Sequence, residues 1–506
     1  MDRRRFLSGT ANTLAALGLG AEKLVAEENG GTGDAVQPRP PRHNVLLLMS
    51  DQHKRTCMGV AGDQVASTPN LDRLAGQSVR FTNAYCSNPV CGPSRASLMT
   101  GLFTHDLNGA GSAVGYSPRY KTIAHAFNSA GYLSALIGKM HFDDAQTHGF
   151  EYKLDFNDWL QYLGPKTKLY AEEKGPPGSG AGFPEIPGLW QSEGDPWKEV
   201  VSPDGRLGPV AVGRPSLMEE SEHFDSFVAR ESVRFLENYG KQDEPFFLVT
   251  SFLKPHEPFM PAKRFAEMYQ PDQMRLSDTW NKANLGSLPK EVQRSIERSP
   301  YTPELSDPNE ARKRMAYYYG SLAQMDDCAG QVLNALDRLG LADNTIVIYT
   351  ADHGEMLGDL GLWDKFQFYE GSCGVPLLAR VPGNAAAICN EPVSLISLAA
   401  TVADLCDVDL TAQKDARSFA DLIVRPGSSF QYGPVFAEFR VGKKDAKYMI
   451  RDGDYKYTYW TNDIPELYNL QADPKEMHNL AALAEHEGIV NRLRRQLFAW
   501  YLPPKA

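Results

Sequence analysis

The chain has 506 residues, of which 42% are hydrophobic and 23% are charged, and it carries a formal net charge of −11 at pH 7. This composition is typical of a globular protein with room for one large domain and a smaller one. The negative charge argues against nucleic acid as a partner, because proteins that bind phosphate backbones carry an excess of Lys and Arg.

The N-terminal 26 residues have the features of an export signal. The run Arg3-Arg4-Arg5-Phe6-Leu7 precedes a mildly apolar stretch from Thr10 to Ala21, which is too short to span a membrane as a helix. This order is similar to a twin-arginine signal, so we expect residues 1–26 to be a signal peptide that the Tat export machinery reads. A Gly- and Pro-rich linker over residues 27–42 follows. No later apolar run reaches the roughly 18 residues that a span needs, so we expect no stable membrane span.

Past the linker, four apolar runs each lead to polar side chains. Continuous apolar runs of this length are typical of strands buried on both faces of a parallel sheet. The runs are Asn44–Met49, Tyr132–Ile137, Pro245–Thr250 and Asn344–Thr350, and they lead to Asp51-Gln52, to Lys139 and His141, to Lys254 and His256, and to Asp352-His353. Helical patterns lie between them over Thr68–Gly76, Ile123–Ala130 and Ala329–Leu339. We therefore predict an α/β fold with a large, mostly parallel central sheet flanked by helices, and a site above the carboxyl ends of its strands.

Residues 91–101 place a cysteine where a short helix begins. The run is Cys91-Gly92-Pro93-Ser94-Arg95-Ala96-Ser97-Leu98-Met99-Thr100-Gly101. Pro93 suits the first helical position, and Gly101 suits the position just past the helix end. Cys91 would then lie near the helix N-terminus, where free backbone N–H groups favour a bound anion. A small buried cysteine beside a loop is the alternative interpretation.

The run from Cys91 resembles the sulfatase signature Cys-x-Pro-Ser-Arg-x-x-x-x-Thr-Gly and matches it at every fixed position. Later motifs follow the order of the same family: Asp352-His353-Gly354-Glu355-Met356-Leu357-Gly358, Gly361-Leu362-Trp363-Asp364-Lys365, Glu370-Gly371-Ser372, Val375-Pro376-Leu377-Leu378, and two motifs over residues 466–470 and 473–480. From Asn44 to about Leu480 the chain is similar to type I sulfatases of the alkaline phosphatase superfamily. The resemblance implies a catalytic α/β domain over residues 43–425 and a smaller C-terminal α+β subdomain over residues 426–506.

The resemblance also implies that Cys91 is oxidised to formylglycine. A formylglycine-generating enzyme or an anaerobic sulfatase-maturating enzyme would be the partner in this conversion. One hydroxyl of the hydrated aldehyde attacks sulfur, and loss of a proton from the other hydroxyl then releases sulfate and restores the aldehyde. The other six cysteines show no Cys-x-x-Cys pair and no zinc-like spacing, and they could form disulfides in an oxidising compartment or stay buried as free thiols.

The family's metal ligands can be assigned residue by residue. They are Asp51, Gln52, Asp352 and His353, together with the group derived from Cys91. Oxygen-rich ligation favours Ca²⁺. Many sulfatases have a second Asp where this chain has Gln52 and an Asn where it has His353, so Mn²⁺ stays an alternative.

The family's catalytic residues match Cys91, Arg95, Lys139, His141, His256 and Lys365. The resemblance implies that Arg95 holds the diol and that Lys139 and Lys365 bind sulfate oxygens. His141 is the expected partner of the second hydroxyl. His256 is the favoured acid for the departing alcohol, with Lys365 as the competing candidate. Lys254 is not assigned a catalytic role, because it can be explained as a residue that supports the loop carrying His256.

The substrate is the least determined part of the prediction. Asp51-Gln52 and the residues around Lys139 and His148 are similar to choline sulfatases, but the chain ends without the extension expected of them, so we do not transfer their substrate. A Pro/Gly-rich insertion over residues 164–215 is expected near the pocket, where Trp190 and Trp197 either stack on sugar rings or fix the loop.

We expect an exported bacterial enzyme, periplasmic or extracellular, that acts on sulfated sugars or on small or aryl sulfate esters. One alternative is a phosphonate monoester or phosphodiester hydrolase of the same superfamily. The other is an inactive protein that binds sulfated glycans.

Overall fold

The structure of the protein is a computed structural model that describes residues 42–107, 117–141, 146–166, 213–216, 218–280, 285–298, 305–410 and 415–503. The predicted signal peptide over residues 1–26 lies outside these residues. So do the linker up to residue 41 and most of the insertion over residues 164–215, including Trp190 and Trp197. All described residues belong to one unit, Arg42–Ala506. The domain boundary at residue 425 stays a prediction.

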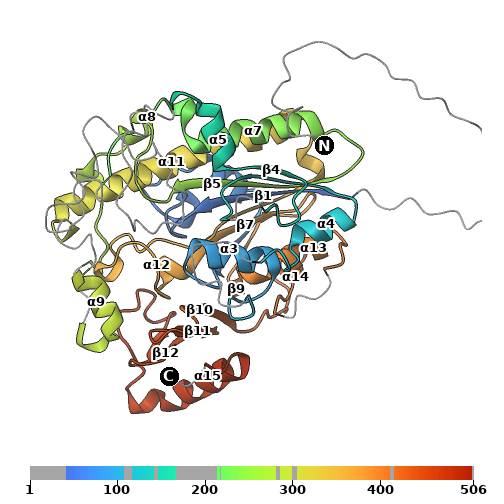
Figure 1. Cartoon of the computed structure of the whole chain (residues 1–506). Helices are drawn as coiled ribbons and strands as arrows, with labels where there is room; N and C mark the ends of the chain where they lie inside the picture. The colour runs from blue at the N-terminus through green and yellow to red at the C-terminus, as the bar shows by residue number, and fades with distance from the viewer. Residues whose placement is uncertain are drawn as a thin grey trace, which may run out of the picture. The chain divides into compact units, whose positions relative to one another are not determined.

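A mixed sheet of nine described strands forms the centre of this unit (Figure 1). The strands lie in the order β4-β3-β5-β1-β6-β7-β2-β8, and β9 pairs with β2. Their bounds are β1 (Asn44–Asp51), β2 (Val79–Tyr85), β3 (Leu133–Gly138), β4 (Tyr152–Leu154), β5 (Phe246–Pro255), β6 (Thr345–Ala351), β7 (Gly374–Arg380), β8 (Ala387–Cys389) and β9 (Val393–Ser394). β7 runs antiparallel to both β6 and β2, whereas the other pairs are parallel. The predicted fold class is therefore confirmed.

The four strands predicted from apolar runs are neighbours in this sheet. β1 lies between β5 and β6, and Val45 pairs with Phe247 on one side and with Ile346 on the other. Every residue of β1, β5 and β6 is buried. Both faces of these strands are covered, which explains why their sequences are continuously apolar rather than alternating.

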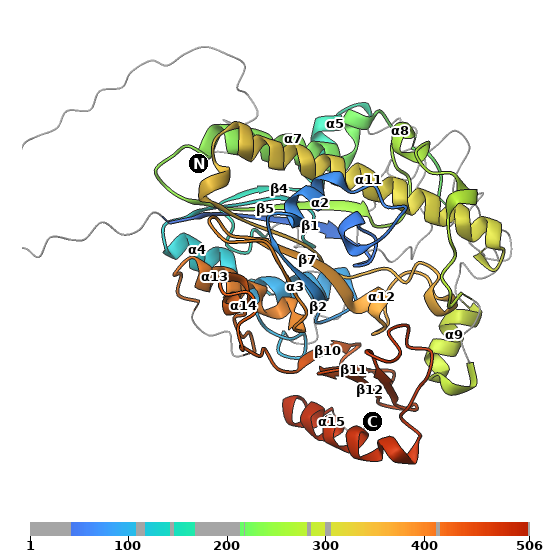
Figure 2. The same ribbon diagram turned by 180° about the vertical axis from the view of Figure 1, so that it is seen from behind.

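Helices cover the two faces of the sheet (Figures 1 and 2). α7 and α11 pack against each other and against β5 on one face, while α3, α4 and α13 contact one another on the other. Along β1, Leu46 and Leu48 belong to the core on the α7–α11 side, and Val45 and Leu47 belong to the core on the other side. The helices of this part are α2 (Pro69–Ala75), α3 (Cys91–Thr100), α4 (Ile123–Ser129), α5 (Phe156–Leu163), α7 (Phe224–Tyr239), α8 (Lys263–Ala266), α9 (Lys290–Arg298), α11 (Pro308–Arg338), α12 (Glu370–Cys373), α13 (Leu398–Leu405) and α14 (Ala420–Val424).

α11 is much longer than the helix predicted over Ala329–Leu339. It begins at Pro308, where the side chain of Asp307 caps the first turn by accepting a hydrogen bond from the backbone N–H of Asn309. None of the described helices is long and apolar enough to cross a membrane.

The C-terminal part is a second, smaller sheet. It is antiparallel, in the order β10-β11-β12-β13, and helix α15 packs against β11 and β12. The bounds are β10 (Val435–Phe439), β11 (Lys447–Asp452), β12 (Tyr455–Trp460), β13 (Glu466–Asn469) and α15 (Glu487–Trp500). The predicted C-terminal α+β subdomain is therefore present.

Candidate active site

The predicted site residues meet at the carboxyl ends of the central strands. Asp51 is the last residue of β1, Lys139 directly follows β3, His256 directly follows β5, and Asp352 directly follows β6. These four strands are parallel neighbours, so their carboxyl ends share one edge of the sheet.

Helix α3 brings Cys91 to this edge as its first residue. Gly101 ends the helix as predicted, with a φ of 65° and its N–H bonded to the Ser97 carbonyl. Pro93 is the third helical residue and not the first, which corrects the prediction. Its position is tolerated because N–H groups of the first turn have no acceptor within the helix. Ser94 Oγ donates to the Asp352 carbonyl at 2.6 Å and so ties the start of α3 to the end of β6.

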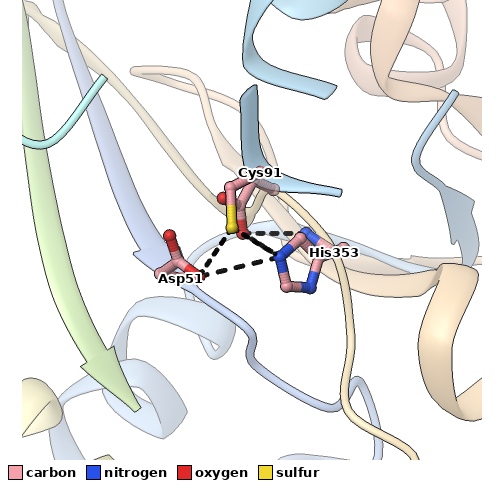
Figure 3. Close-up of side chains that lie close together, drawn as sticks. Asp51, Cys91 and His353 are labelled. Carbon is pink, nitrogen blue, oxygen red and sulfur yellow. Dashed lines mark hydrogen bonds and ion pairs between the residues drawn. The ribbon is translucent and has the colours of Figure 1, made fainter. Parts of the chain in front are cut away.

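Cys91, Asp51 and His353 form a close buried group (Figure 3). Cys91 Sγ lies 3.0 Å from His353 Nε2 and 3.6 Å from Asp51 Oδ1, and His353 Nε2 lies 3.7 Å from Asp51 Oδ1. Asp352 completes the group, and one ligand atom from each of the four residues lies within 4.8 Å of the others. His353 Nδ1 lies 2.9 Å from the Gly354 carbonyl, so Nδ1 carries the proton and Nε2 turns its lone pair toward the group.

The chemistry of this donor set fits a divalent cation. Oxygens of two carboxylates and one imidazole nitrogen converge within 4.8 Å of one another in the buried interior, and such converging donors are what a bound divalent cation coordinates. Oxygen donors suit Ca²⁺, and the imidazole also suits Mn²⁺.

Gln52, the fifth predicted ligand, makes different contacts in the structure. Its φ is 61°, its Oε1 accepts from Lys365 Nζ at 2.6 Å, and its Nε2 donates to Glu257 and Glu355 at 2.5 and 2.6 Å. Its role as a ligand stays a prediction.

Arg95 holds the two carboxylates of the group in place. Its Nε donates to Asp352 Oδ2 at 2.7 Å, its Nη2 donates to Asp51 Oδ2 at 3.0 Å, and its Nη1 donates to Ser251 Oγ at 2.8 Å. The guanidinium therefore joins the ends of β1, β5 and β6.

Lys139 adds a second cation, with Nζ 2.5 Å from Asp51 Oδ2. Burial alone would raise the pKa of the Asp51 carboxyl, but the neighbouring positive charges, Lys139 foremost and Arg95 with it, hold that pKa well below its ordinary value. Asp51 therefore stays ionised over the physiological pH range.

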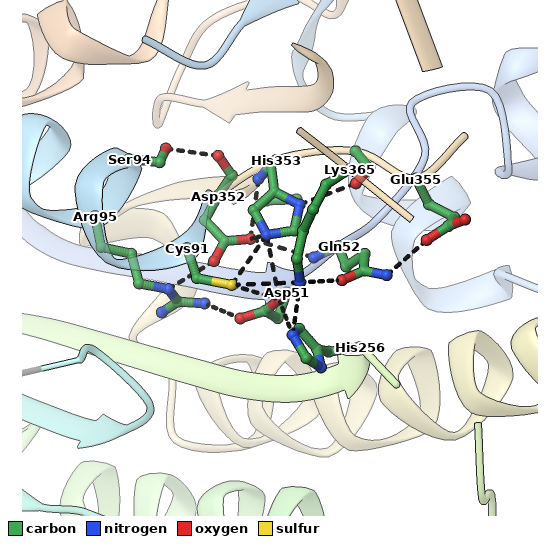
Figure 4. Close-up of polar contacts among 12 residues, drawn as sticks. Asp51, Gln52, Cys91, Ser94, Arg95, His256, Asp352, His353, Glu355 and Lys365 are labelled. Atoms are coloured by element: carbon green, nitrogen blue, oxygen red, sulfur yellow. Dashed lines mark hydrogen bonds and ion pairs between the residues drawn. The ribbon is translucent and has the colours of Figure 1, made fainter. Parts of the chain in front are cut away.

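Lys365 and His256, the two candidates for the acid, lie against each other (Figure 4). Lys365 Nζ is 2.8 Å from His256 Nε2 and 3.7 Å from Cys91 Sγ. Burial alone would lower the pKa of Lys365, but Cys91, Glu257 and Asp364 raise it well above its ordinary value. His256 Nδ1 lies 2.6 Å from the Glu257 carbonyl, so Nδ1 carries the imidazole proton and Nε2 accepts a hydrogen bond from the Lys365 ammonium.

His141 follows β3 with a φ of 58°. Burial lowers its pKa well below the ordinary value, and the charges of Lys139 and Arg95 lower it further. His141 is therefore neutral at pH 7, as a proton acceptor must be.

Lys254 supports the His256 loop. Its Nζ donates to the Met260 carbonyl at 2.9 Å, and its backbone N–H donates to Asp225 Oδ1 at 3.0 Å.

Residues 43–408 match the protein-family model described as Sulfatase. The chain belongs to the sulfatase family. Residues 358–501 of this sulfatase also match the model described as N-sulphoglucosamine sulphohydrolase, C-terminal. Both matches agree with the motifs around Cys91 and Asp352, and they make the protein a sulfuric ester hydrolase of the alkaline phosphatase superfamily.

Alignments with known proteins extend over most of this sulfatase. A choline-sulfatase of Rhizobium meliloti is 30% identical over 447 residues, which cover 87% of this chain and 82% of the relative. An arylsulfatase of Clostridium perfringens is 29% identical and covers 90% of this chain and 93% of its own. The crystal structure of a phosphonate monoester hydrolase of Agrobacterium radiobacter superposes with a TM-score of 0.73 at 24% identity, covering 90% and 95% of the two chains, and so shares the fold.

The sequence analysis of this sulfatase missed one group of side chains. Glu257, Glu355 and Asp364 have carboxylate oxygens within 4.8 Å of one another, and Gln52 Nε2, whose amide has two N–H donors, lies 2.5, 2.6 and 3.3 Å from an oxygen of Glu257, Glu355 and Asp364. Burial raises the pKa of Asp364 to about 7, with a contribution from the negative charge of Glu257. Each of the three residues is a direct neighbour of a predicted residue or belongs to a quoted motif, but nothing in the sequence indicates that they converge.

Proposed function

We propose that this sulfatase cleaves sulfate monoesters through a formylglycine derived from Cys91. The observation that carries the proposal is the buried group in which residue 91 lies within 4.8 Å of Asp51, Asp352 and His353. These residues would hold a Ca²⁺ or Mn²⁺ ion, with Gln52 as a proposed fifth ligand. The cation would lower the pKa of the hydroxyls on residue 91 and offset negative charge on the transferring sulfate.

The first step is the transfer of sulfate to the enzyme. One hydroxyl on residue 91 loses its proton to solvent, its oxygen forms a bond to sulfur, and the ester oxygen leaves with the electron pair of the broken S–O bond. The Lys365–His256 pair is the proposed acid that supplies a proton to that oxygen. Lys365 Nζ lies 2.8 Å from His256 Nε2, so the proton on Lys365 is hydrogen-bonded within this pair. Arg95, Lys139 and Lys365 surround the group and stabilise the charge that develops.

The second step releases sulfate. His141, which is neutral at pH 7, takes the proton of the second hydroxyl on residue 91. The electrons of that O–H bond form the C=O bond of the aldehyde, and the C–O bond to sulfate breaks. Water then adds to the aldehyde and restores the diol.

Sulfated sugars and small or aryl sulfate esters are the proposed substrates. The names of the relatives and of the C-terminal family model support these classes. A phosphonate monoester hydrolase is the second candidate, because Gln52 and His353 depart from many sulfatases and because the phosphonate monoester hydrolase structure shares the fold. Both kinds of ester carry one negative charge at neutral pH, so discrimination must come from the transition state.

The test is a comparison of rates on matched aryl esters. Purified enzyme loaded with Ca²⁺ or Mn²⁺ should show a larger kcat/KM for para-nitrophenyl sulfate than for para-nitrophenyl phenylphosphonate. Cys91→Ala should abolish turnover, whereas Cys406→Ala, at a buried cysteine directly after α13 whose thiol interacts with Tyr132, should keep it. A clear preference for the phosphonate ester would favour the second candidate, and multiple turnover by Cys91→Ala would overturn the mechanism.

A further inference from the structure

The loop that carries Lys365 has a strained backbone on both sides of that residue. Asp364 has a φ of 71° and Phe366 has a φ of 77°, a region that side chains other than glycine rarely adopt. Such residues persist only when the surrounding structure holds them, and they gather at functional sites. The position of Lys365 therefore depends on what holds this loop.

Lys447 of the C-terminal sheet reaches this loop at Gln367. It is the first residue of β11, its side chain is buried, and its Nζ donates to Gln367 Oε1 at 2.5 Å. Three aromatic rings surround the ammonium, with centroids at 4.5 Å for Trp460, 5.1 Å for Phe439 and 5.4 Å for Phe368.

Gln367 is also hydrogen-bonded to two other parts of the structure, so its contact with Lys447 helps to fix the loop. Its backbone N–H donates to Ser372 Oγ at 3.3 Å, and its Nε2 donates to Ser295 Oγ of α9 at 3.5 Å. Phe366 also packs against Phe439 of β10, with ring centroids 6.1 Å apart. The C-terminal sheet thus contacts both residues that follow Lys365.

Burying the Lys447 side chain costs desolvation free energy. Burial lowers the pKa of Lys447 to about 7, although the charge of Glu466 opposes the shift. A well-packed apolar side chain in its place would avoid the desolvation of an ammonium group. Packing alone therefore does not account for a lysine here.

We propose that Lys447 is a positioning residue for the sulfatase reaction. Through Gln367 it fixes the loop around Lys365 and so sets the Lys365 ammonium beside His256 and residue 91. This inference rests on the role given to Lys365 in the proposed function. It assigns to the C-terminal sheet a part in the chemistry, although Lys447 itself touches no reacting atom.

The test is a double-mutant cycle on the full-length, metal-loaded enzyme. Lys447→Met removes the donor, Gln367→Met removes the acceptor, and the double variant removes both. Lys444→Met, at an exposed lysine three residues upstream, is the matched control. We expect each single variant to lower kcat for the aryl sulfate by about 10- to 100-fold, since a misplaced catalytic group costs rates of this order. KM should change little, and the double variant should be no slower than the slower single one.

Several results would overturn the inference. Wild-type kcat in Lys447→Met, or losses that multiply in the double variant, would show that Lys447 does not act through Gln367. If the activity of Lys447→Met falls only as far as its folded fraction does, as measured by thermal unfolding, then Lys447 contributes to stability and not to positioning. If Lys447→Met does not fold, Gln367→Met must show the loss alone, and wild-type kcat in that variant would refute the inference. If the enzyme prefers the phosphonate ester, the proposed function fails, and the same cycle is measured on that ester.

Discussion

Asp51 is the residue on which the charges of the site converge. Arg95 and Lys139 share its Oδ2 at 3.0 and 2.5 Å, while its Oδ1 faces Cys91 at 3.6 Å and His256 at 3.9 Å. One carboxylate oxygen is therefore fixed by cations of the protein, and the other faces the reacting group. This division lets a single buried aspartate both anchor the site and offer a ligand atom.

His141 leads to a prediction about the pH dependence of the reaction. Its folded-state pKa lies well below the ordinary histidine value of about 6.5 because of burial and the nearby Lys139 and Arg95, and a bound cation would shift it in the same direction. A base is active when neutral, so His141 should stay active as the pH falls through 6.5 and lose activity only below its lowered pKa. We expect the acid limb of kcat to have its midpoint below the ordinary histidine value of about 6.5.

Steady-state rates from pH 4.5 to 8 on the aryl sulfate measure this limb, with circular dichroism at each pH to confirm folding. A limb centred at the ordinary histidine value that disappears in His141→Gln would contradict the assigned environment.

The residues of the site were predictable where a motif contains them or where they lie at or directly after the end of an apolar strand, as Asp51, Lys139 and His256 do. Cys91, Arg95, Asp352 and Lys365 belong to family motifs, and the structure brings all four together. The carboxylates of Glu257, Glu355 and Asp364 meet around Gln52 through the packing of separate loops. Side-chain directions in loops follow from tertiary contacts, which the local sequence does not contain.

At the level of elements, the apolar strands were predicted to within two residues except at the end of β5, which extends five residues past Thr250. Burial on both faces leaves an unbroken apolar run that marks each strand. Most of α11 was not predicted. From Pro308 to Cys328 its buried residues include Arg314, Ser321, Gln324 and Asp326, which interrupt the apolar period although the helix is covered. Tertiary contacts of these polar groups, such as Asp326 with the N–H groups of Asn70 and Leu71, compensate for the weak pattern.

The end of β3 requires a glycine at residue 138. Gly138 has a φ of 114°, and a Cβ built there would lie 1.9 Å from the Ser251 carbonyl oxygen of β5. Gly138→Ala should therefore push β3 away from β5 and displace Lys139. We expect a loss of stability of about 3 kcal/mol or more and a loss of kcat/KM in the fraction that still folds.

Gly62→Ala is the matched control, because Gly62 also has a positive φ, at 96°, but no atom lies within 4 Å of a Cβ there. That variant should lose only about 1 kcal/mol. Chemical unfolding of both proteins measures the difference, and equal losses would contradict the close approach of β3 to β5.

At the level of the whole molecule, buried ion pairs and hydrogen bonds join the C-terminal sheet to the part of the chain that carries the site. Lys456 of β12 lies 2.8 Å from Glu370 and 2.6 Å from Glu476. Arg55, in the loop that follows β1, lies 2.6 Å from the same Glu370. Tyr369 donates to Glu466 of β13 at 2.6 Å. The segment that joins Lys365 to α12 is thus held from both sides, so the C-terminal sheet belongs to the scaffold of the site.

Export is a property of the whole chain and depends on residues outside the described structure. We propose that Arg3 and Arg4 direct folded enzyme to the Tat machinery, so that Cys91 can be oxidised in the cytoplasm first. Replacing both with Lys should leave the precursor inside the cell. Arg5→Lys makes the same charge-preserving substitution outside the Arg3–Arg4 pair and should be exported normally. Cell fractionation measures both, and export of the Arg3→Lys/Arg4→Lys variant at the wild-type level would refute the assignment.

The central claim is that residue 91 of the active enzyme is a formylglycine. Trypsin should release the peptide Phe81–Arg95, which contains both Cys86 and Cys91 and so carries its own control. After reduction and alkylation, the account predicts a peptide with one alkylated cysteine, at residue 86, and an aldehyde at residue 91 that makes the residue lighter than cysteine. The converted fraction should rise in proportion to the specific activity of each preparation. Full activity from protein in which both cysteines are alkylated would contradict the account.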